Sequence, residues 1–192
     1  MTTGLTGAFL TGDLFNLFVF FELLVISACV LTAISDDRYG AEAAYKYYYI
    51  SLLASMFLLV ASGGLYASYG TLNLADLAQR IQAAPSMPLA GLSMACLMIF
   101  FLVKSAVVPF HFWQPDFHAV SPTAVSAMLS SVVVKLGVYG FLRMRTLLFI
   151  SWEEQIGQAL VVLGLMGVFF GGLAAIGAVH AKRMLAYSTL AQ

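Results

Sequence analysis

Three ionisable side chains interrupt the apolar runs of this sequence, and their chemistry suits proton exchange. Glu22, Lys104 and Lys135 each lie near the middle of a run of about 20 mostly apolar residues. An unpaired charge at that depth of a membrane helix costs about 2.5–3.5 kcal/mol, so the three together cost roughly 8–10 kcal/mol. We therefore expect them to be paired, hydrated or partly neutral. A buried lysine can release its proton near neutral pH, whereas a neighbouring carboxylate retains that proton.

A buried glutamate–lysine pair that only fixes the register of two helices is the simpler alternative. Such a pair accounts for Glu22 and one lysine, but it leaves the second lysine unexplained. Three ionisable groups on three different apolar segments favour a proton relay, because polar groups at this depth usually face a bundle interior or a water-filled route.

The segment after Lys104 predicts a broken helix. Pro109 has no N–H to donate to Ser105, its ring clashes with that carbonyl, and Val108 is pushed away from helical angles. We expect a kink or break one turn after Lys104, near Pro109. Unwound backbone at that depth is tolerated only inside protein or against water, and broken helices beside ionisable residues are typical of ion sites in transporters.

His118 follows the break and is the predicted point of proton access. Histidine titrates near physiological pH, so His111 and His118 can pass protons from an aqueous side toward the two lysines. The alternative is a histidine ring that only lies among lipid headgroups. We expect no metal site, because two histidines with Asp116 between them form no recognised ligand set.

The helices that must position these groups are five apolar stretches, each long enough to span a bilayer. They cover residues 13–34, 46–69, 92–112, 122–142 and 155–179. Of the 192 residues, 61% are hydrophobic and 9% are charged. This composition excludes an ordinary soluble enzyme, a nucleic-acid binder and a disordered chain. We predict an all-α polytopic membrane protein, because a helix satisfies its own backbone polar groups in lipid.

Both ends of the chain carry shorter helical pieces. Residues 1–12 are too short to span a bilayer, and residues 181–192 begin a further helical segment. We expect a single transmembrane domain that is part of a longer chain, with a complete protein of five spans as the alternative. Cys29 and Cys96 lie in apolar runs and predict neither a metal site nor a disulfide framework.

Four motifs occur in the order that a known superfamily shows. They are residues 11–22 (TGDLFNLFVFFE), the stretch 101–113 around Lys104 and Pro109, residues 122–126 with 135–139 (PTAVS and KLGVY), and residues 182–188 (KRMLAYS). With these motifs the chain resembles the proton-translocating, antiporter-like membrane subunits. They include the D subunits of Mrp-type Na⁺/H⁺ antiporters, which the first motif resembles most, and relatives in respiratory complex I and membrane-bound hydrogenases.

The resemblance implies a fold of two inverted five-helix repeats, of which this chain would hold most of the first. By motif position, Glu22 is similar to the family's fifth-helix glutamate, Lys104 to its seventh-helix lysine and Lys135 to its eighth-helix lysine. In the family, the Glu–Lys pair modulates the central lysine, and the eighth-helix lysine passes the proton onward. His118 matches a connection histidine assigned to proton access. The chain departs from the family pattern at Ala181, where relatives often have an aspartate, and it lacks the later broken helix with its own Lys or Glu.

The residues and the resemblance together predict proton translocation in a multisubunit Na⁺/H⁺ antiporter. Protons would arrive near His118, exchange through Lys104 under the control of Glu22, and leave through Lys135. The implied partners are other membrane subunits, protons, Na⁺ and the lipid bilayer, with no nucleic acid, and the expected location is the inner (plasma) membrane of a prokaryote.

Two other functions are compatible with the sequence. One is a proton-pumping membrane subunit of complex I or of a membrane-bound hydrogenase, driven by electron transfer in partner subunits. The other is a structural membrane subunit that transports nothing. The sequence has no flavin, haem or iron–sulfur signature, so we expect no cofactor and no enzyme activity of the chain by itself.

Overall fold

The regular elements of the computed structural model, which describes residues 1–34, 38–85 and 87–192, are all helices. This confirms the predicted all-α class. In chain order the elements are α1 (Thr2–Leu10), α2 (Leu14–Ala33), α3 (Arg38–Tyr69), α4 (Leu74–Ala83), α5 (Ala90–Lys104), α6 (Trp113–Val120), α7 (Thr123–Met128), the π-helical turn η1 (Leu129–Val133), α8 (Val134–Leu147), the 3₁₀ turn η2 (Ile150–Trp152), α9 (Glu153–Gly177) and α10 (Ala181–Ala191).

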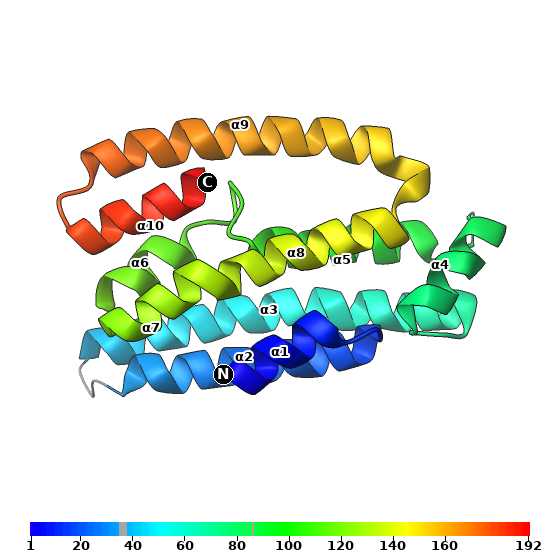
Figure 1. The fold of residues 1–192 in the computed structure, drawn as a ribbon, viewed down its shortest axis with the longest axis horizontal. Helices are drawn as coiled ribbons and strands as arrows, with labels where there is room; N and C mark the ends of the chain where they lie inside the picture. The colour runs from blue at the N-terminus through cyan, green and yellow to red at the C-terminus, as the bar shows by residue number, and fades with distance from the viewer. Residues whose placement is uncertain (35–37, 86) are drawn as a thin grey trace.

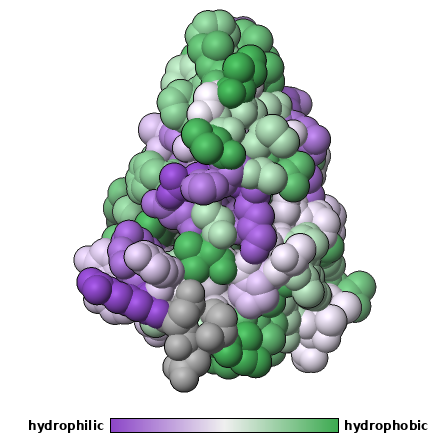
Figure 2. Space-filling view, turned by 90° about the vertical axis from the view of Figure 1, so that its left-hand side faces the viewer, coloured by the Kyte–Doolittle hydropathy of each residue, from purple (hydrophilic) through white to green (hydrophobic). Residues whose placement is uncertain are grey.

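The long helices lie side by side along one direction (Figure 1). α3 packs against both α2 and α5, and α5 packs against α8. α9 runs along the far side of the molecule, and α10 folds back to contact both α9 and α6. Within the described residues, four helical stretches are long and apolar enough to cross a membrane, namely α2, α3, α7 through α8, and α9. Figure 2 looks onto the end where α6, α7 and α10 meet, and hydrophilic side chains gather across the middle of that end.

The third predicted span is shorter than expected, because α5 ends at Lys104 rather than near residue 112. Ala106 takes the left-handed conformation (φ 53°), and its N–H donates to the Val103 carbonyl. The next N–H, of Val107, donates to the Leu102 carbonyl. These two hydrogen bonds form a Schellman motif, which closes a helix at its C-terminal end. The predicted break is therefore present, but it begins one turn earlier than Pro109 alone predicts.

Two other helices are longer than predicted. α3 begins at Arg38 rather than near residue 46. Alanines favour the helix over residues 38–45, and an ion pair between Glu42 and Lys46 (2.7 Å) adds one turn of side-chain support. The fourth predicted helix continues past residue 142 to Leu147.

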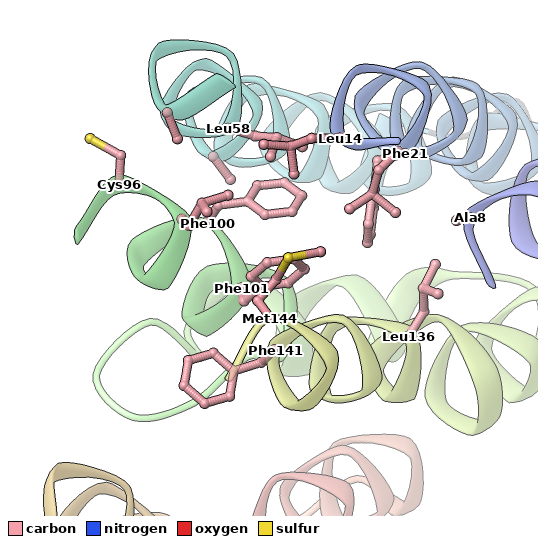
Figure 3. Close-up of a cluster of buried hydrophobic side chains, with 14 of the residues drawn as sticks. Ala8, Leu14, Phe21, Leu58, Cys96, Phe100, Phe101, Leu136, Phe141 and Met144 are labelled. Carbon is pink, nitrogen blue, oxygen red and sulfur yellow. The ribbon is translucent and has the colours of Figure 1, made fainter. Parts of the chain in front are cut away.

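The core lies between α2, α3, α5 and α8 and is built around phenylalanine rings (Figure 3). The ring centroid of Phe100 lies 5.0 Å from that of Phe21 and 4.9 Å from that of Phe101. The Phe101 ring in turn lies 6.5 Å from Phe141 of α8. Gly140 approaches Phe101 so closely that a Cβ at this position would overlap the ring. This aromatic cluster fixes α2, α5 and α8 relative to one another.

Candidate functional site

Lys104, the last residue of α5, lies in an apolar and aromatic environment. The residue is 7% exposed, and its Nζ lies 5.9 Å from the centroids of both the Phe21 and the Phe100 rings. Nζ has no hydrogen-bond partner among the described residues. Because the face of an aromatic ring attracts a cation, the two rings replace part of the hydration that the ammonium loses on burial.

Glu22 lies next to Phe21 on α2, and its Oε1 is buried without a hydrogen-bond partner in the described residues. No ion pair joins Glu22 to Lys104 in the part of the chain that the structure describes. The ion pairs found there are Lys46–Glu42, Arg80–Asp76, Arg145–Glu153 and Arg183–Asp116. A pair that only fixes helix register requires a direct contact, and the described residues do not form it.

Lys135 lies at the start of α8 in different surroundings. It is exposed within this chain, and the π-helical turn Leu129–Val133 ends two residues before it. Such turns frequently lie at functional sites, because the extra residue redirects the side chains that follow. Two residues on, a Cβ at Gly137 would lie 2.9 Å from backbone atoms of Lys104 and Ser105. α8 therefore touches the end of α5 beside the break.

Two cavities meet at Lys135. One, of about 300 Å³, is lined by the break residues 105–108 and by residues of α9 and α10. The other, of about 380 Å³, extends from Lys135 to His118, and its remaining polar lining includes the hydroxyl residues Thr123, Ser126, Ser130, Ser131, Ser188 and Thr189. Lys135 therefore links the segment that follows Lys104 with His118.

His118 lies on α6, is 2% exposed, and has its Nδ1 2.7 Å from Ser126 Oγ. One turn further along, Ser130 Oγ lies 2.7 Å from Thr189 Oγ1 of α10. A hydroxyl can accept one proton while it donates another, so these groups form polar steps from His118 toward Lys135. Burial lowers the pKa of His118 to about 4. The imidazole is therefore neutral at neutral pH, with one nitrogen that donates and one that accepts.

Two basic residues of α10 hold α6 in place. Lys182 Nζ donates to the Ser121 carbonyl (2.9 Å), and Arg183 pairs with Asp116 (2.9 Å). These contacts lie at the end of the molecule across which hydrophilic side chains gather (Figure 2). His118 is thus carried by a helix that is fixed in place at a polar end of the bundle.

The four predicted site residues fall into two groups. His118 and Lys135 share the larger cavity, whereas Glu22 and Lys104 lie in the core. Lys104 lines neither cavity. The larger cavity therefore connects His118 to Lys135 without including Lys104, and the order of the three residues in proton transfer stays a prediction.

Sequence analysis gave no role to the hydroxyl groups that connect these residues. Ser126 and Ser130 are four residues apart on one helical stretch, and this spacing was the one local signal. Thr189 reaches Ser130 only through the fold. Among the described residues, no group of three or more histidine, cysteine or carboxylate side chains could hold a metal ion.

Comparisons with known proteins give matches over nearly the whole chain. The family model described as NADH:quinone oxidoreductase/Mrp antiporter, TM, matches residues 11–192. The chain is 32% identical over 192 residues to the D subunit of the Na(+)/H(+) antiporter of Alkalihalophilus pseudofirmus, covering 100% of this chain and 39% of the relative. It is 37% identical over 193 residues to the N subunit of the NADH-quinone oxidoreductase of Desulforudis audaxviator, covering 98% of this chain and 38% of the relative.

A solved structure shows the same arrangement of helices. The structure of the Mrp complex from Dietzia sp. DQ12-45-1b matches with a TM-score of 0.87 and 31% identity, over 99% of this chain and 36% of that chain. The chain spans about two fifths of the length of the curated relatives it matches. Its long apolar helices and these relatives identify it as a multi-pass membrane protein, as the composition predicted.

Proposed function

Because this chain belongs to the NADH:quinone oxidoreductase/Mrp antiporter transmembrane family, we propose that it moves protons across the membrane as part of a multisubunit Na⁺/H⁺ antiporter. The observation that carries the proposal is the position of Lys135 on two cavities, one beside the break after Lys104 and one that reaches His118. The similarity to the D subunit of a Na(+)/H(+) antiporter supports the choice of cation and of membrane partner subunits.

The proposed route follows the polar groups of the larger cavity. A proton reaches His118 at the polar end of α6, passes along the hydroxyl groups of Ser126, Ser130 and Thr189, and protonates Lys135. Lys135 then exchanges protons with Lys104 beside the smaller cavity.

Glu22 is the control element of this route. A negative charge on Glu22 attracts a positive charge on Lys104 through the low-dielectric core, where a charge acts over a longer distance than in water. A conformational change that moves Glu22 away therefore releases the proton from Lys104 toward Lys135.

The test is proton flux in inside-out membrane vesicles that contain the chain with its native partner subunits. We expect Lys104→Ala and Lys135→Ala each to lower Na⁺-dependent proton flux by about tenfold or more, because each removes a proton-carrying group. Glu22→Ala should lower it less, since Glu22 acts on Lys104 without carrying the transferred proton. Lys46→Ala, which removes an exposed lysine of α3, is the matched control. Normal assembly with unchanged flux in both lysine variants would contradict the proposal and favour a structural membrane subunit.

A proton-pumping subunit of a respiratory complex is the second candidate, and the 37% identity to the N subunit of an NADH-quinone oxidoreductase favours it. The same residues would move protons there, with energy from electron transfer in partner subunits. Flux that requires Na⁺ and persists without NADH supports the antiporter. Flux that requires NADH oxidation and persists without Na⁺ supports the respiratory pump.

A further inference from the structure

Trp113 is a buried tryptophan that the proposed route does not use. Its side chain is 6% exposed, and it is the first residue of α6. Its indole Nε1–H donates to the Val103 carbonyl over 3.2 Å, and Val103 directly precedes Lys104 at the end of α5. Among the hydrogen bonds of the described residues, this one alone joins α6 to α5.

The end of α5 is closed without this bond. The N–H of Ala106 already donates to the Val103 carbonyl, and the N–H of Val107 donates to the Leu102 carbonyl, which completes the Schellman motif. A carbonyl oxygen has two lone pairs, so the indole is a second donor to Val103. A phenylalanine would supply an apolar ring at position 113 without that N–H. The indole therefore adds a tie between two helices at a helix end that is already satisfied.

The same bond holds together the two ends of the segment that forms the break. Residues 105–112 connect α5 with α6, and the bond joins residue 103 to residue 113 across this connection. Residues 105–108 line the smaller cavity at Lys135. Holding the ends of a short loop together removes most of the conformations that it can adopt. The indole therefore restricts where Lys104 and one wall of the cavity can lie.

α6 is a firm support for this bond, because it is held on two sides. The centroid of the Tyr47 ring of α3 lies 5.1 Å from that of Trp113 and 4.6 Å from that of Phe117. On the other side, the two basic residues of α10 bind α6. α6 thus lies between α3 and α10 (Figure 1).

α10 connects this support with Lys135, because residues of α10 line both cavities that meet there. Packed helices shift as units rather than deforming continuously. A change around Lys135 that moves α10 is therefore passed to α6 through Lys182 and Arg183, and from α6 to the end of α5 through Trp113.

We propose that the Trp113 indole ties the Lys104 end of α5 to α6, so that the position of α10 beside Lys135 sets the position of Lys104. The inference rests on the proposed proton translocation. Trp113 carries no proton of the route, so it is a positioning residue. The tie lets the surroundings of the two lysines change together.

The experiment replaces Trp113 by benzothienylalanine, which keeps the two fused rings and has sulfur in place of the indole N–H. In vesicles that contain the complete assembly, we expect Na⁺-dependent proton flux to fall about three- to tenfold, the range that corresponds to one lost hydrogen bond. Fluorotryptophan at the same position keeps the N–H and should restore the flux. Benzothienylalanine at Trp152 of η2, whose indole has no hydrogen-bond partner among the described residues, is the matched control and should not change the flux.

A pH profile separates positioning from poorer assembly. A variant that only assembles less well loses flux by the same factor at every pH. A change in the position of Lys104 should instead move the pH of half-maximal flux by about half a unit to one unit, which equals a three- to tenfold change in proton occupancy. Unchanged flux, or lower flux with an unchanged pH profile, would overturn the inference. Trp113→Phe also lacks the N–H and replaces the benzothienylalanine variant if that variant assembles poorly.

A second arm tests the part of α10. Arg183→Glu makes this residue repel Asp116, so it separates α10 from α6 and should lower the flux, and the swapped pair Asp116→Arg with Arg183→Glu should restore it. In the benzothienylalanine background, Arg183→Glu should have little further effect, because both changes interrupt the same linkage. Losses that multiply would mean that α10 and Trp113 act independently, and the linkage would be overturned.

The outcomes also distinguish this inference from the proposed function. If Lys104→Ala lowers the flux and the benzothienylalanine variant keeps the wild-type flux and pH profile, the Trp113 inference fails and the proposed function stands. If Lys104→Ala and Lys135→Ala both leave the flux unchanged, the proposed function fails, and a positioning role of Trp113 in proton transfer fails with it.

Discussion

Lys104 and Lys135 lie on packed neighbouring helices, but their surroundings are opposite. Lys104 is 7% exposed, lies between two phenylalanine rings, and has no hydrogen-bond partner in the described chain. Lys135 is exposed onto two cavities, the larger of which is rich in hydroxyl groups. A charge is costly in the first environment and well solvated in the second. In a relay that contains both lysines, Lys104 is therefore the step at which protonation can be controlled, and Lys135 is the step that equilibrates with its surroundings.

The same contrast bears on the proposed control of Lys104 by Glu22, which does not touch it. In the aromatic core the effective dielectric constant is low, so a charge is felt beyond contact distance. A carboxylate placed on the Lys135 cavity would be screened by hydroxyl groups and water. The position of Glu22 on α2, next to Phe21 of the Lys104 environment, suits control over Lys104 rather than over Lys135.

The largest expected effect tests whether the Lys104 environment is close-packed. Phe100→Ala should lower the free energy of unfolding by about 3–5 kcal/mol, because it removes a 0% exposed ring that contacts both Phe21 and Phe101. The measurement is denaturant unfolding of the detergent-purified protein, followed by helical circular dichroism. Phe169→Ala, at a position of α9 that is 73% exposed, is the control and should change stability by less than about 0.5 kcal/mol. Equal losses in the two variants would show that the ring cluster is not the packed core.

The next prediction tests how far hydration extends from the larger cavity at Lys135 into α6. His118 lines this cavity and yet is buried. Burial lowers the pKa of His118 from its ordinary 6.5 to about 4. Between these two pH values the unfolded chain binds more protons than the folded one, so stability falls as the pH falls. The loss is about 1.4 kcal/mol per pH unit and about 3 kcal/mol in total.

His118→Gln is the variant that checks this pH dependence. Its free energy of unfolding should fall less between pH 6.5 and pH 4 than that of the wild type, because glutamine has no group that titrates there. The measurement is a series of unfolding curves across that range. Identical slopes for the two proteins would mean that His118 is hydrated in the folded state, and that the hydrated region extends into α6.

Much of what concerns the residues in and beside the core was predictable, because the patterns that indicate it lie within single stretches of sequence. A charge within a run of about 20 apolar residues is visible in the sequence, and this gave the depth of Glu22, Lys104 and Lys135. Pro109 also predicted the break from local sequence, because its missing N–H removes a hydrogen bond from the helix that contains it. The exact start of the break was not predictable, because it depends on Ala106 adopting a left-handed conformation that alanine seldom takes. The roles of the predicted residues in proton transfer stay predictions.

The residues that line the larger cavity were less predictable, because their contacts join segments that are distant in sequence. Ser130 meets Thr189 across 59 residues, and this contact forms only when α10 folds back. His118 meets Ser126 only because α6 and α7 turn toward each other at Ser121.

The smallest expected effect separates the two lysines most directly. Methionine has a flexible chain without a charge, so Lys104→Met and Lys135→Met make the same change in the two environments. Lys104→Met should raise the free energy of unfolding by about 1–3 kcal/mol, because it removes a buried ammonium without a hydrogen-bond partner in the described chain. Lys135→Met should change it by less than about 0.5 kcal/mol, because Lys135 is exposed.

The measurements are denaturant unfolding and vesicle proton flux, and both variants should lose flux. Equal changes in stability would contradict the contrast, and control could then not be assigned to Lys104. A variant that is more stable and inactive at Lys104, beside one that is equally stable and inactive at Lys135, would identify Lys104 as the position where a costly charge is retained for its function.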